Sequence, residues 1–345
     1  MTETKDMKPE RLNVSVSLGE TACSLYDIDL DKYYHDPKLI CEVEKNTYED
    51  FGADGVGTTI GLHGMAEAFG SIVRYQPKQL RYTQTPLLTR IEELSKLRVP
   101  DPEKDGLLPV VLEALDRINT ELKGKTAIAC SVAGPITVAL NLCGAENILK
   151  WLRKFPKEVH EIMAIITEAN NLFIDEIHKR GASIGFADPV ASVTVISYQQ
   201  FKDYALSYLA ENVRYAEKIS GESPSLHICG KSKQIWDDLA DCGIGAFSVD
   251  NCEDLQDLKE AVGERIHIVG NVPPVEVIMK GTKEAIDRSI KDCILKGYDS
   301  PKGYSIAAGC QIPYGTPREN IAYYVERSKE LVKLPIDVER LRSDN

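Results

Sequence analysis

The chain has 345 residues, of which 43% are hydrophobic and 27% are charged, and its formal net charge is -12. This length suits one large barrel or two ordinary domains of a globular enzyme. The negative charge argues against a nucleic acid or an anionic membrane surface as the main partner, although local arginine or lysine side chains could still hold small anions.

Eight short apolar runs have the composition of β-strands, and each is followed by a segment whose apolar residues recur at helical spacing. The expected strands are 13–18, 55–60, 126–133, 183–189, 225–230, 246–251, 267–272 and 304–310. The expected helices are 37–51, 107–122, 147–180 with a break at Pro156, 199–219, 233–242, 253–262, 282–295 and 317–331.

The strict alternation of strands and helices predicts a parallel sheet with crossover helices, and eight such units predict a (β/α)8 TIM barrel. A doubly wound sheet and two smaller α/β domains are the alternatives. The segment 61–102 is longer than an ordinary loop, so we interpret it as an insertion after strand two, with a short hairpin at 73–82.

The two ends of the chain are polar. We expect an N-terminal extension at 1–11, a single barrel domain at 12–334 and a polar tail at 335–345. The first ten residues lack the apolar segment of a secretory signal, and no run approaches the ~18 apolar residues of a membrane span. Nine scattered cysteines then indicate a cytoplasmic protein with reduced thiols.

A histidine and two cysteines fall at the carboxyl ends of two expected strands. His227 and Cys229 lie two residues apart, so both side chains point to one face of the fifth strand. Cys310 ends the eighth strand, and strands five and eight share one barrel mouth. One imidazole and two thiolates form a three-ligand set for zinc, with the open fourth position of a catalytic site. The competing interpretation is buried reduced cysteines beside a core histidine.

Further polar residues end or follow other expected strands. Asp250 could complete the zinc shell, in competition with Glu253, Cys252 or a water molecule. Three more are candidates for substrate binding, although each carboxylate could simply cap the next helix. These three are Glu20, Asp188 and Asn271. His63, in a glycine-flanked loop, could reach the mouth or could be an ordinary surface histidine.

Several short motifs in a specific order carry a resemblance. They are His-Ile-Cys-Gly at 227–230, Gly-Asn-Val at 270–272, Ala-Gly-Cys at 308–310 and Thr-Pro-Arg-Glu-Asn at 316–320, with Gly-Pro-Ile-Thr at 134–137 and Ala-Asp-Pro-Val-Ala-Ser at 187–192. Over residues 10–332 the chain resembles the uroporphyrinogen decarboxylase superfamily. Within it, the chain is similar to the corrinoid-dependent methyltransferases of the methylcobamide:coenzyme M methyltransferase type.

The resemblance implies a zinc-dependent enzyme that moves a methyl group between a corrinoid and a zinc-activated thiol such as coenzyme M. The corrinoid, a methylcobamide, would ride on a separate corrinoid-binding protein. His227, Cys229 and Cys310 would hold the zinc, while Asp188 and Asn271 would position the acceptor or the corrinoid. Homocysteine and tetrahydrofolate remain open as acceptors. The opposite direction, demethylation of a methyl ether or methylamine onto the corrinoid, is also open.

Two other functions are weighed against this one. A uroporphyrinogen decarboxylase needs arginines near its N-terminus to hold the carboxylates of its substrate, and this chain has only Arg11 before Arg74. A non-catalytic zinc-binding barrel would be expected to carry four protein ligands close together in the sequence, unlike the three found here.

Overall fold

An eight-stranded parallel sheet forms the centre of the molecule in the computed structural model, which describes residues 10–342. Its strands run in the order β1-β10-β9-β8-β7-β6-β5-β2. Their bounds are β1 Asn13–Val14, β2 Gly55–Thr59, β5 Ala127–Ala133, β6 Ser183–Ala187, β7 Ser225–Ile228, β8 Ala246–Val249, β9 His267–Val269 and β10 Tyr304–Ile306. Apart from the separate β3–β4 hairpin, consecutive strands from β2 to β10 lie side by side, and β1 pairs with β10, the last strand in the sequence. The sheet therefore curls into the predicted TIM barrel and lacks the switch point of a doubly wound sheet.

The barrel is closed between its first two strands by a side chain. The ladder pairs recorded within residues 10–342 do not join β1 directly to β2. The carboxylate of Asp54, just before β2, accepts a hydrogen bond from the backbone N–H of Val14 at 2.8 Å and another from Arg11 at 2.6 Å. This carboxylate therefore bridges the gap where backbone pairing is missing.

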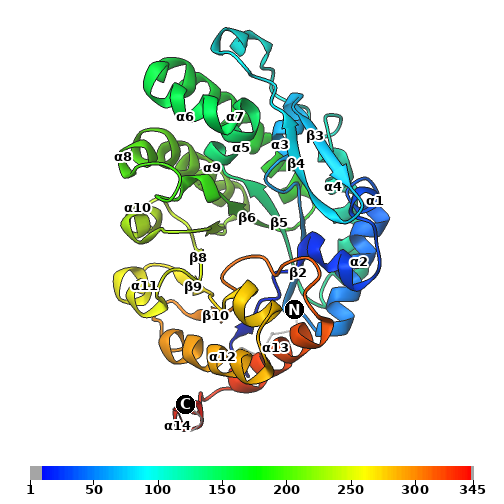
Figure 1. The fold of residues 1–345 in the computed structure, drawn as a ribbon, viewed down its shortest axis with the longest axis vertical. Coiled ribbons are helices and arrows are strands. Elements are labelled where there is room, and N and C mark those ends of the chain that lie inside the picture. The colour runs from blue at the N-terminus through cyan, green and yellow to red at the C-terminus, as the bar shows by residue number, and fades with distance from the viewer. Residues whose placement is uncertain (1–9, 343–345) are drawn as a thin grey trace, which may run out of the picture.

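Helices surround the sheet, as Figure 1 shows. The longer ones are α2 Pro37–Phe51, α4 Leu108–Leu122, α5 Pro135–Cys143, α6 Ala145–Lys154, α7 Pro156–Lys179, α9 Ser207–Ser220, α11 Leu255–Val262, α12 Lys283–Gly297 and α13 Arg318–Leu331. The shorter ones are α1 Leu30–Tyr33, α3 Gly64–Phe69, α8 Tyr198–Gln200, α10 Trp236–Asp241 and α14 Val338–Arg342. Helix α2 shows why their ends can be predicted. Asp36 caps its first turn, Pro37 begins it, and Gly52 ends it at a φ of 59°.

All eight predicted strands are present, but several end earlier than expected. The largest differences are at β1, which ends at Val14, and at β10, which ends at Ile306, so Cys310 lies in a loop rather than at the end of a strand. Beyond Ile306 the chain keeps a single bridge, from Ala308 to Val272, and then folds over the mouth, where the N–H of Ile312 donates to the carbonyl of Ser17. The loop leaves the ladder because it must cross from β10 toward β1.

The helix predictions were confirmed with two differences. The break at Pro156 separates α6 from α7 as expected. Helix α5 was not predicted, although Gly134-Pro135 is a helix start of the usual kind. A π-helical segment, Phe201–Leu206, interrupts the helix expected at 199–219.

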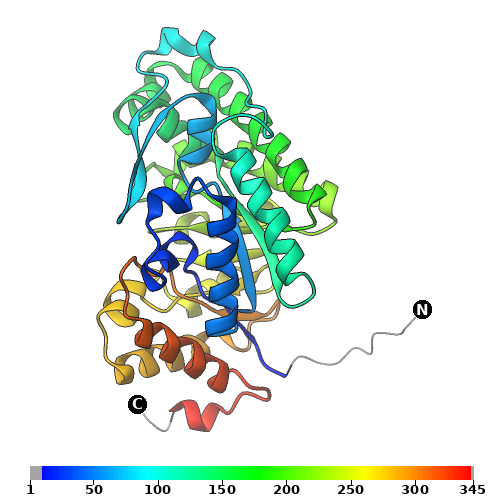
Figure 2. The same ribbon diagram turned by 90° about the vertical axis from the view of Figure 1, so that its right-hand side faces the viewer.

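The insertion after β2 contains the expected hairpin. Its strands are β3 Ile72–Gln76 and β4 Gln79–Thr85, and Figures 1 and 2 show it standing beside the barrel mouth. Much of the predicted N-terminal tail lies outside the described residues. The predicted C-terminal tail needs a correction, because α14 forms there and buries Leu341, an apolar residue in an otherwise polar segment. Nowhere between residues 10 and 342 is a helix long and apolar enough to cross a membrane.

The barrel interior is lined by small residues. A cavity of about 680 Å³ runs between the strands, and its walls include Gly57, Ala129, Gly185 and Ser225. TIM barrels usually fill this space with bulky branched side chains. Here the space reaches His227 from inside the barrel.

Glu44 of α2 generates a prediction about stability. Its side chain is buried, one oxygen accepts from the N–H of Gly57 at 3.2 Å, and burial raises the pKa of the carboxyl to about 7. The unfolded value is ~4.3, so the stabilising effect of the neutral form is complete below pH ~4 and is lost as the pH rises to 7. We expect Glu44→Gln to lose less free energy of unfolding than the wild type between pH 5 and 8, by on the order of 2 kcal/mol.

Urea unfolding at the two pH values measures this difference. Glu42→Gln, at an exposed position of the same helix, is the matched control and should follow the wild type. Parallel pH profiles for wild type and Glu44→Gln would contradict the prediction.

Candidate metal centre

His227 is held in one orientation by the neighbouring strand. It lies in β7, and its Nδ1 is 3.0 Å from both the carbonyl oxygen and the hydroxyl of Ser248 in β8. A carbonyl oxygen can only accept, so Nδ1 carries the proton. The lone pair of Nε2 is therefore free to bind a metal, and the contact with Ser248 orients the ring in the way that supporting residues of metal sites do.

The two predicted cysteines meet this free nitrogen. Nε2 of His227 lies 2.9 Å from Sγ of Cys229, and the two sulfur atoms of Cys229 and Cys310 are 3.3 Å apart. The three atoms lie within 4.8 Å of one another, so they could hold a single metal ion. The structure thus brings together, from β7 and from the loop after β10, the three ligands expected from the sequence.

Two glycines allow the cysteines to approach. Gly230 has a φ of +77°, and a Cβ atom there would lie 2.8 Å from the hydroxyl of Thr194. A Cβ atom at Gly309 would lie 2.5 Å from the backbone nitrogen of Asn251. A side chain at either position would push a cysteine-bearing loop away from the centre.

The contact between the two thiols shifts their pKa values in opposite directions. The hydrogen bond from Cys229 lowers the pKa of Cys310, and His227 adds to this effect. The same contact raises the pKa of Cys229, with burial as the next cause. A thiol must lose its proton to bind a cation, and the contact between the two sulfurs favours that loss at one of them.

Asp250 supports the loop that carries Cys229 instead of joining the three ligands. One carboxylate oxygen accepts from the N–H of Gly230 at 2.7 Å, and the other accepts from the N–H of Cys252 at 2.8 Å. The described group of possible ligands consists of the histidine and two cysteines alone. Whether Asp250 ever completes a metal shell stays a prediction.

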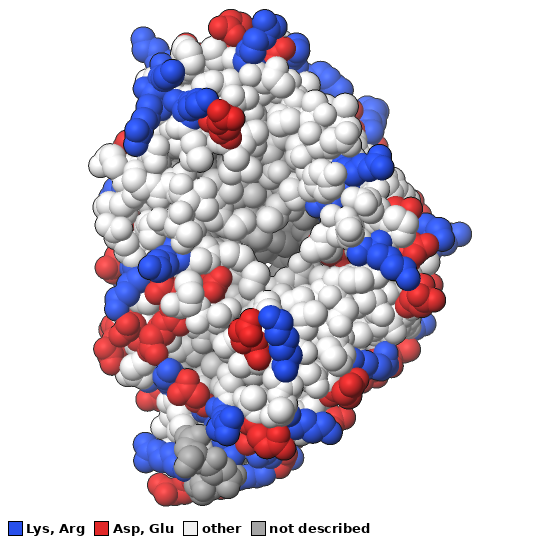
Figure 3. All heavy atoms as spheres, viewed as in Figure 1, with Lys and Arg blue, Asp and Glu red and all other residues white. Residues whose placement is uncertain are grey.

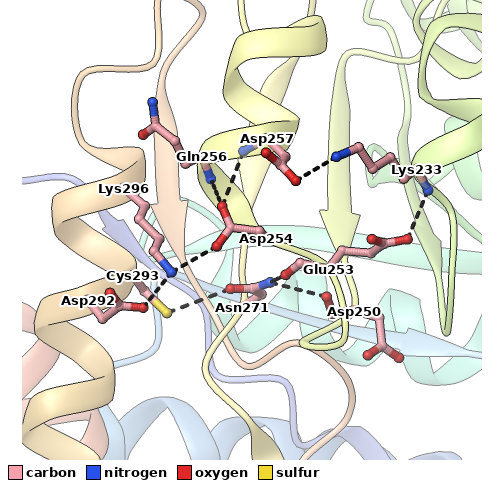
Figure 4. Close-up of polar contacts among 10 residues, drawn as sticks. All are labelled: Lys233, Asp250, Glu253, Asp254, Gln256, Asp257, Asn271, Asp292, Cys293 and Lys296. Atoms are coloured by element: carbon pink, nitrogen blue, oxygen red, sulfur yellow. Dashed lines mark hydrogen bonds and ion pairs between the residues drawn. The ribbon is translucent and has the colours of Figure 1, made fainter.

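Asn271 ties together the loops behind the centre, as Figure 4 shows. Its amide donates to the carbonyl oxygens of Asp250 at 3.1 Å and of Glu253 at 2.8 Å. The Glu253 carboxylate accepts from the backbone N–H groups of Ser232 and Lys233, at 2.6 and 2.9 Å. Asn271 thus holds the loop after β8 in place. It is not among the described residues that line the cavity beside the candidate metal ligands.

Asp188 is likewise placed in the protein interior. It is completely buried after β6, and one oxygen accepts from the N–H and hydroxyl of Thr137 at the start of α5. Burial raises the pKa of this carboxyl to about 7, and its other oxygen has no partner among the described residues. Its predicted role in substrate binding remains untested.

A cavity of about 470 Å³ opens beside the three candidate metal ligands. This volume is in the usual range for a small-molecule site. Figure 3 shows a hollow near the centre of this face, bordered mostly by uncharged residues. Glu20, one of the predicted substrate-binding residues, lines the cavity, and so do His63 and Arg81.

His63 and Arg81 extend the predicted site in different ways. His63 reaches the mouth as one interpretation of its loop suggested. Its Nδ1 lies 2.7 Å from the Asn141 side-chain oxygen, and burial lowers its pKa, so the ring is neutral near pH 7. Arg81 was missed. Its only sequence signal is that a charged residue stands between Leu80 and Tyr82 in the hairpin, and the hairpin's position over the mouth was not predictable.

Comparison with known proteins places the chain among enzymes. The model of the uroporphyrinogen decarboxylase (URO-D) family matches residues 4–331. A methylated-thiol–coenzyme M methyltransferase of Methanosarcina mazei is 28% identical over 87% of this chain and 78% of its own. A methylcobamide:CoM methyltransferase of Methanosarcina barkeri is 28% identical over 85% of each chain. A solved methyltransferase structure from Methanosarcina mazei has a TM-score of 0.84 and 26% identity, covering 93% of this chain and 94% of its own.

The two backbone contacts of Asp250 generate a second prediction. Asp250→Ala removes the acceptor of two N–H groups in the loops beside Cys229, so we expect the free energy of unfolding to fall by about 1–3 kcal/mol. Asp257→Ala is the control, because it removes a carboxylate from the same region whose ion pair with Lys233 is half exposed. Urea unfolding measures both variants. Equal, small losses for the two would show that Asp250 does not hold these loops.

Proposed function

Because this chain belongs to the uroporphyrinogen decarboxylase family, as its motifs predicted, we propose that it is a zinc-dependent methyltransferase acting on a corrinoid and a small thiol. Its likeness to coenzyme M methyltransferases over most of its length supports this activity. The thiol is proposed as the acceptor of the methyl group. Methyl transfer in the opposite direction, from a methyl ether or methylamine, is an outcome that the experiment below distinguishes.

The convergence of His227, Cys229 and Cys310 is the observation that carries the proposal. A tetrahedral zinc with Zn–S bonds of ~2.3 Å would hold its two sulfur ligands roughly 3.8 Å apart. The two sulfur atoms lie 3.3 Å apart, so a small outward movement of the cysteines would accommodate the ion. One imidazole nitrogen and two sulfurs are typical zinc donors, and three protein ligands leave one position for a substrate. A zinc ion bound there would lower the pKa of an incoming thiol, so that its sulfur is a nucleophilic thiolate at neutral pH.

The residues of this chain would orient the reaction. Ser248 keeps the Nε2 atom of His227 directed at the two sulfurs. Ionised Cys229 and Cys310 would bring two negative charges, which keep electron density on the acceptor sulfur. The cavity holds the acceptor beside this centre. A bond then forms between that sulfur and the methyl carbon while the carbon–cobalt bond breaks, and cobalt keeps the electron pair.

The hairpin beside the mouth favours a partner that delivers the corrinoid. Ile72, Leu80 and Tyr82 are large apolar residues of β3 and β4, and each is exposed. Exposed apolar residues gathered at one site are typical of surfaces that bind another molecule. We infer that a corrinoid-binding protein docks over the mouth against this hairpin, while the small thiol occupies the cavity.

Two further features bear on competing interpretations. Arg81 is the single lysine or arginine among the described residues that line the cavity, which suits a small ligand better than a porphyrinogen with many carboxylates. All nine cysteines are free, as a reducing compartment such as the cytoplasm requires. The cytoplasmic location remains part of the proposal.

Loss of one ligand should abolish both metal binding and methyl transfer. We expect Cys310→Ala to bind zinc at least about tenfold more weakly and to lose methyl transfer from methylcobalamin to a thiol, because two ligands hold zinc poorly. Zinc content is measured by metal analysis, and demethylation of methylcobalamin by visible absorbance.

Cys252→Ala is the matched control, since this cysteine is exposed on the loop beside the centre and should leave both measurements unchanged. Full turnover by Cys310→Ala would overturn the metal assignment. Failure of every thiol, with methylation of reduced cobalamin by a methyl ether or methylamine, would reverse the proposed direction.

A further inference from the structure

An acidic and a basic side chain share one wall of the cavity, away from the metal ligands. Glu20 lies in the 3-10 helix Gly19–Leu25 that follows β1, and Arg81 lies in β4 of the hairpin. Both line the cavity that holds Cys229 and Cys310. Arg81 is only 5% exposed. Charges so enclosed are costly unless a partner compensates for them.

The two side chains do not compensate for each other by direct contact. Among the described residues, no ion pair of 4.0 Å or less joins them, although the charge of Arg81 lowers the pKa of the Glu20 carboxyl and the charge of Glu20 raises the pKa of Arg81. The guanidinium lies 4.4 Å from the ring centre of Tyr34, and a Cβ atom at Gly61 would be 2.5 Å from its Nη2. The buried hydroxyl of Tyr34 has no partner of good hydrogen-bond geometry in the described chain. Glu20 and Arg81 therefore lie near each other without a direct salt bridge that a ligand would have to break.

The wall connects to the metal ligands through the neighbour of Cys310. The side-chain amide of Gln311 donates to the carbonyl oxygen of Leu18 at 2.8 Å, and it lies 3.2 Å from the position of a Cβ atom at Gly19. Glu20 is the next residue. Cys310, Gln311, Glu20 and Arg81 thus line one cavity, in which a single ligand can meet both the cysteines and the two charged residues.

We propose that Glu20 and Arg81 select a thiol that carries both an ammonium and an acid group, as an α-amino acid does. The ammonium would donate to the Glu20 carboxylate, and the acid group would accept the paired N–H donors of Arg81. This inference rests on the proposed function and names the class of its acceptor. Both residues would be specificity-determining, because they contact the end of the substrate that does not react.

A ligand with a single negative charge fits this wall less well. A sulfonate or carboxylate bound to Arg81 would lie beside the Glu20 carboxylate, and like charges in an enclosed space repel each other strongly. Burial raises the pKa of Glu20, while the charge of Arg81 opposes this and favours the ionised carboxylate. An added ammonium also favours the ionised carboxylate, whereas an added anion disfavours it.

Binding of methylated products tests the proposal without requiring turnover. Isothermal titration calorimetry on the zinc-loaded wild type would compare L-methionine with 4-(methylthio)butanoate, 3-(methylthio)propylamine and 2-(methylthio)ethanesulfonate. Compared with methionine, 4-(methylthio)butanoate lacks the ammonium, and 3-(methylthio)propylamine lacks the carboxylate. 2-(Methylthio)ethanesulfonate lacks the ammonium and has a sulfonate as its acid group. We expect methionine to bind at least about tenfold more tightly than each of the others, because each loses a charge-assisted contact.

Substitutions assign each charge to its residue. Glu20→Gln should weaken methionine at least about tenfold while leaving 4-(methylthio)butanoate unchanged or tighter. Arg81→Lys, which keeps the charge of a buried position, should weaken all three ligands that carry an acid group and leave the amine unchanged. Glu49→Gln and Arg74→Lys, at exposed positions of α2 and β3, are the matched controls.

The outcomes separate this inference from the proposed function. Tightest binding by the sulfonate, equal binding of all four ligands, or no binding of methionine would overturn the selection of an amino-acid thiol. Methyl transfer to 2-mercaptoethanesulfonate but not to homocysteine would do the same while leaving the proposed function intact. Selective binding of methionine without methyl transfer to any thiol would instead overturn the proposed function.

Discussion

The register of the parallel strands is the constraint on which the site depends. His227 of β7 pairs with Ser248 of β8, Ser248 with Val269 of β9, and Val269 with Ser305 of β10. This register places the carbonyl oxygen of Ser248 beside the imidazole of His227 and so decides which ring nitrogen faces the cysteines. It also brings the carboxyl ends of β7 and β10 to one mouth, where residues 81 positions apart come into contact. A shift of one residue in the register of β7 would turn the side chain of His227 away from the mouth.

A second layer of polar contacts keeps this arrangement in place. The loops after β7, β8 and β9 have few backbone partners of their own, and side chains supply the missing ones. Asp250 and Glu253 accept N–H groups of the loop after β7, while Asn271 donates to carbonyl groups of the loop after β8. Each contact satisfies a backbone group that would otherwise lose its hydrogen bond in a crowded region. The sequence suggested Asp250 and Glu253 as metal ligands and Asn271 as a substrate-binding residue. All three contact the backbone around the candidate metal ligands.

The charges of the cavity serve a different purpose from those of the loops. Asp250 and Glu253 are satisfied by the protein itself, whereas Glu20 and Arg81 line the cavity without a direct ion pair between them. The hairpin that contributes Arg81 also presents exposed Leu80 and Tyr82 at the mouth. The β3–β4 hairpin thus contributes Arg81 to the part of the cavity that would bind the unreactive end of a thiol. It also contributes to the surface on which a corrinoid-binding protein would dock. Its placement links recognition of the two substrates.

The sequence by itself determined what depends on near neighbours in the chain. The period of the apolar residues predicted the eight strands, Pro156 predicted the break between α6 and α7, and the spacing of His227 and Cys229 predicted two ligands on one face. The tertiary structure alone decided that Cys310 reaches them from a loop, that Asp188 turns inward to Thr137, and that Arg81 lines the same cavity as Glu20. The reason is physical. Local periodicity arises from backbone geometry within a few residues, whereas the direction of a loop side chain depends on which distant surface is left for it to pack against.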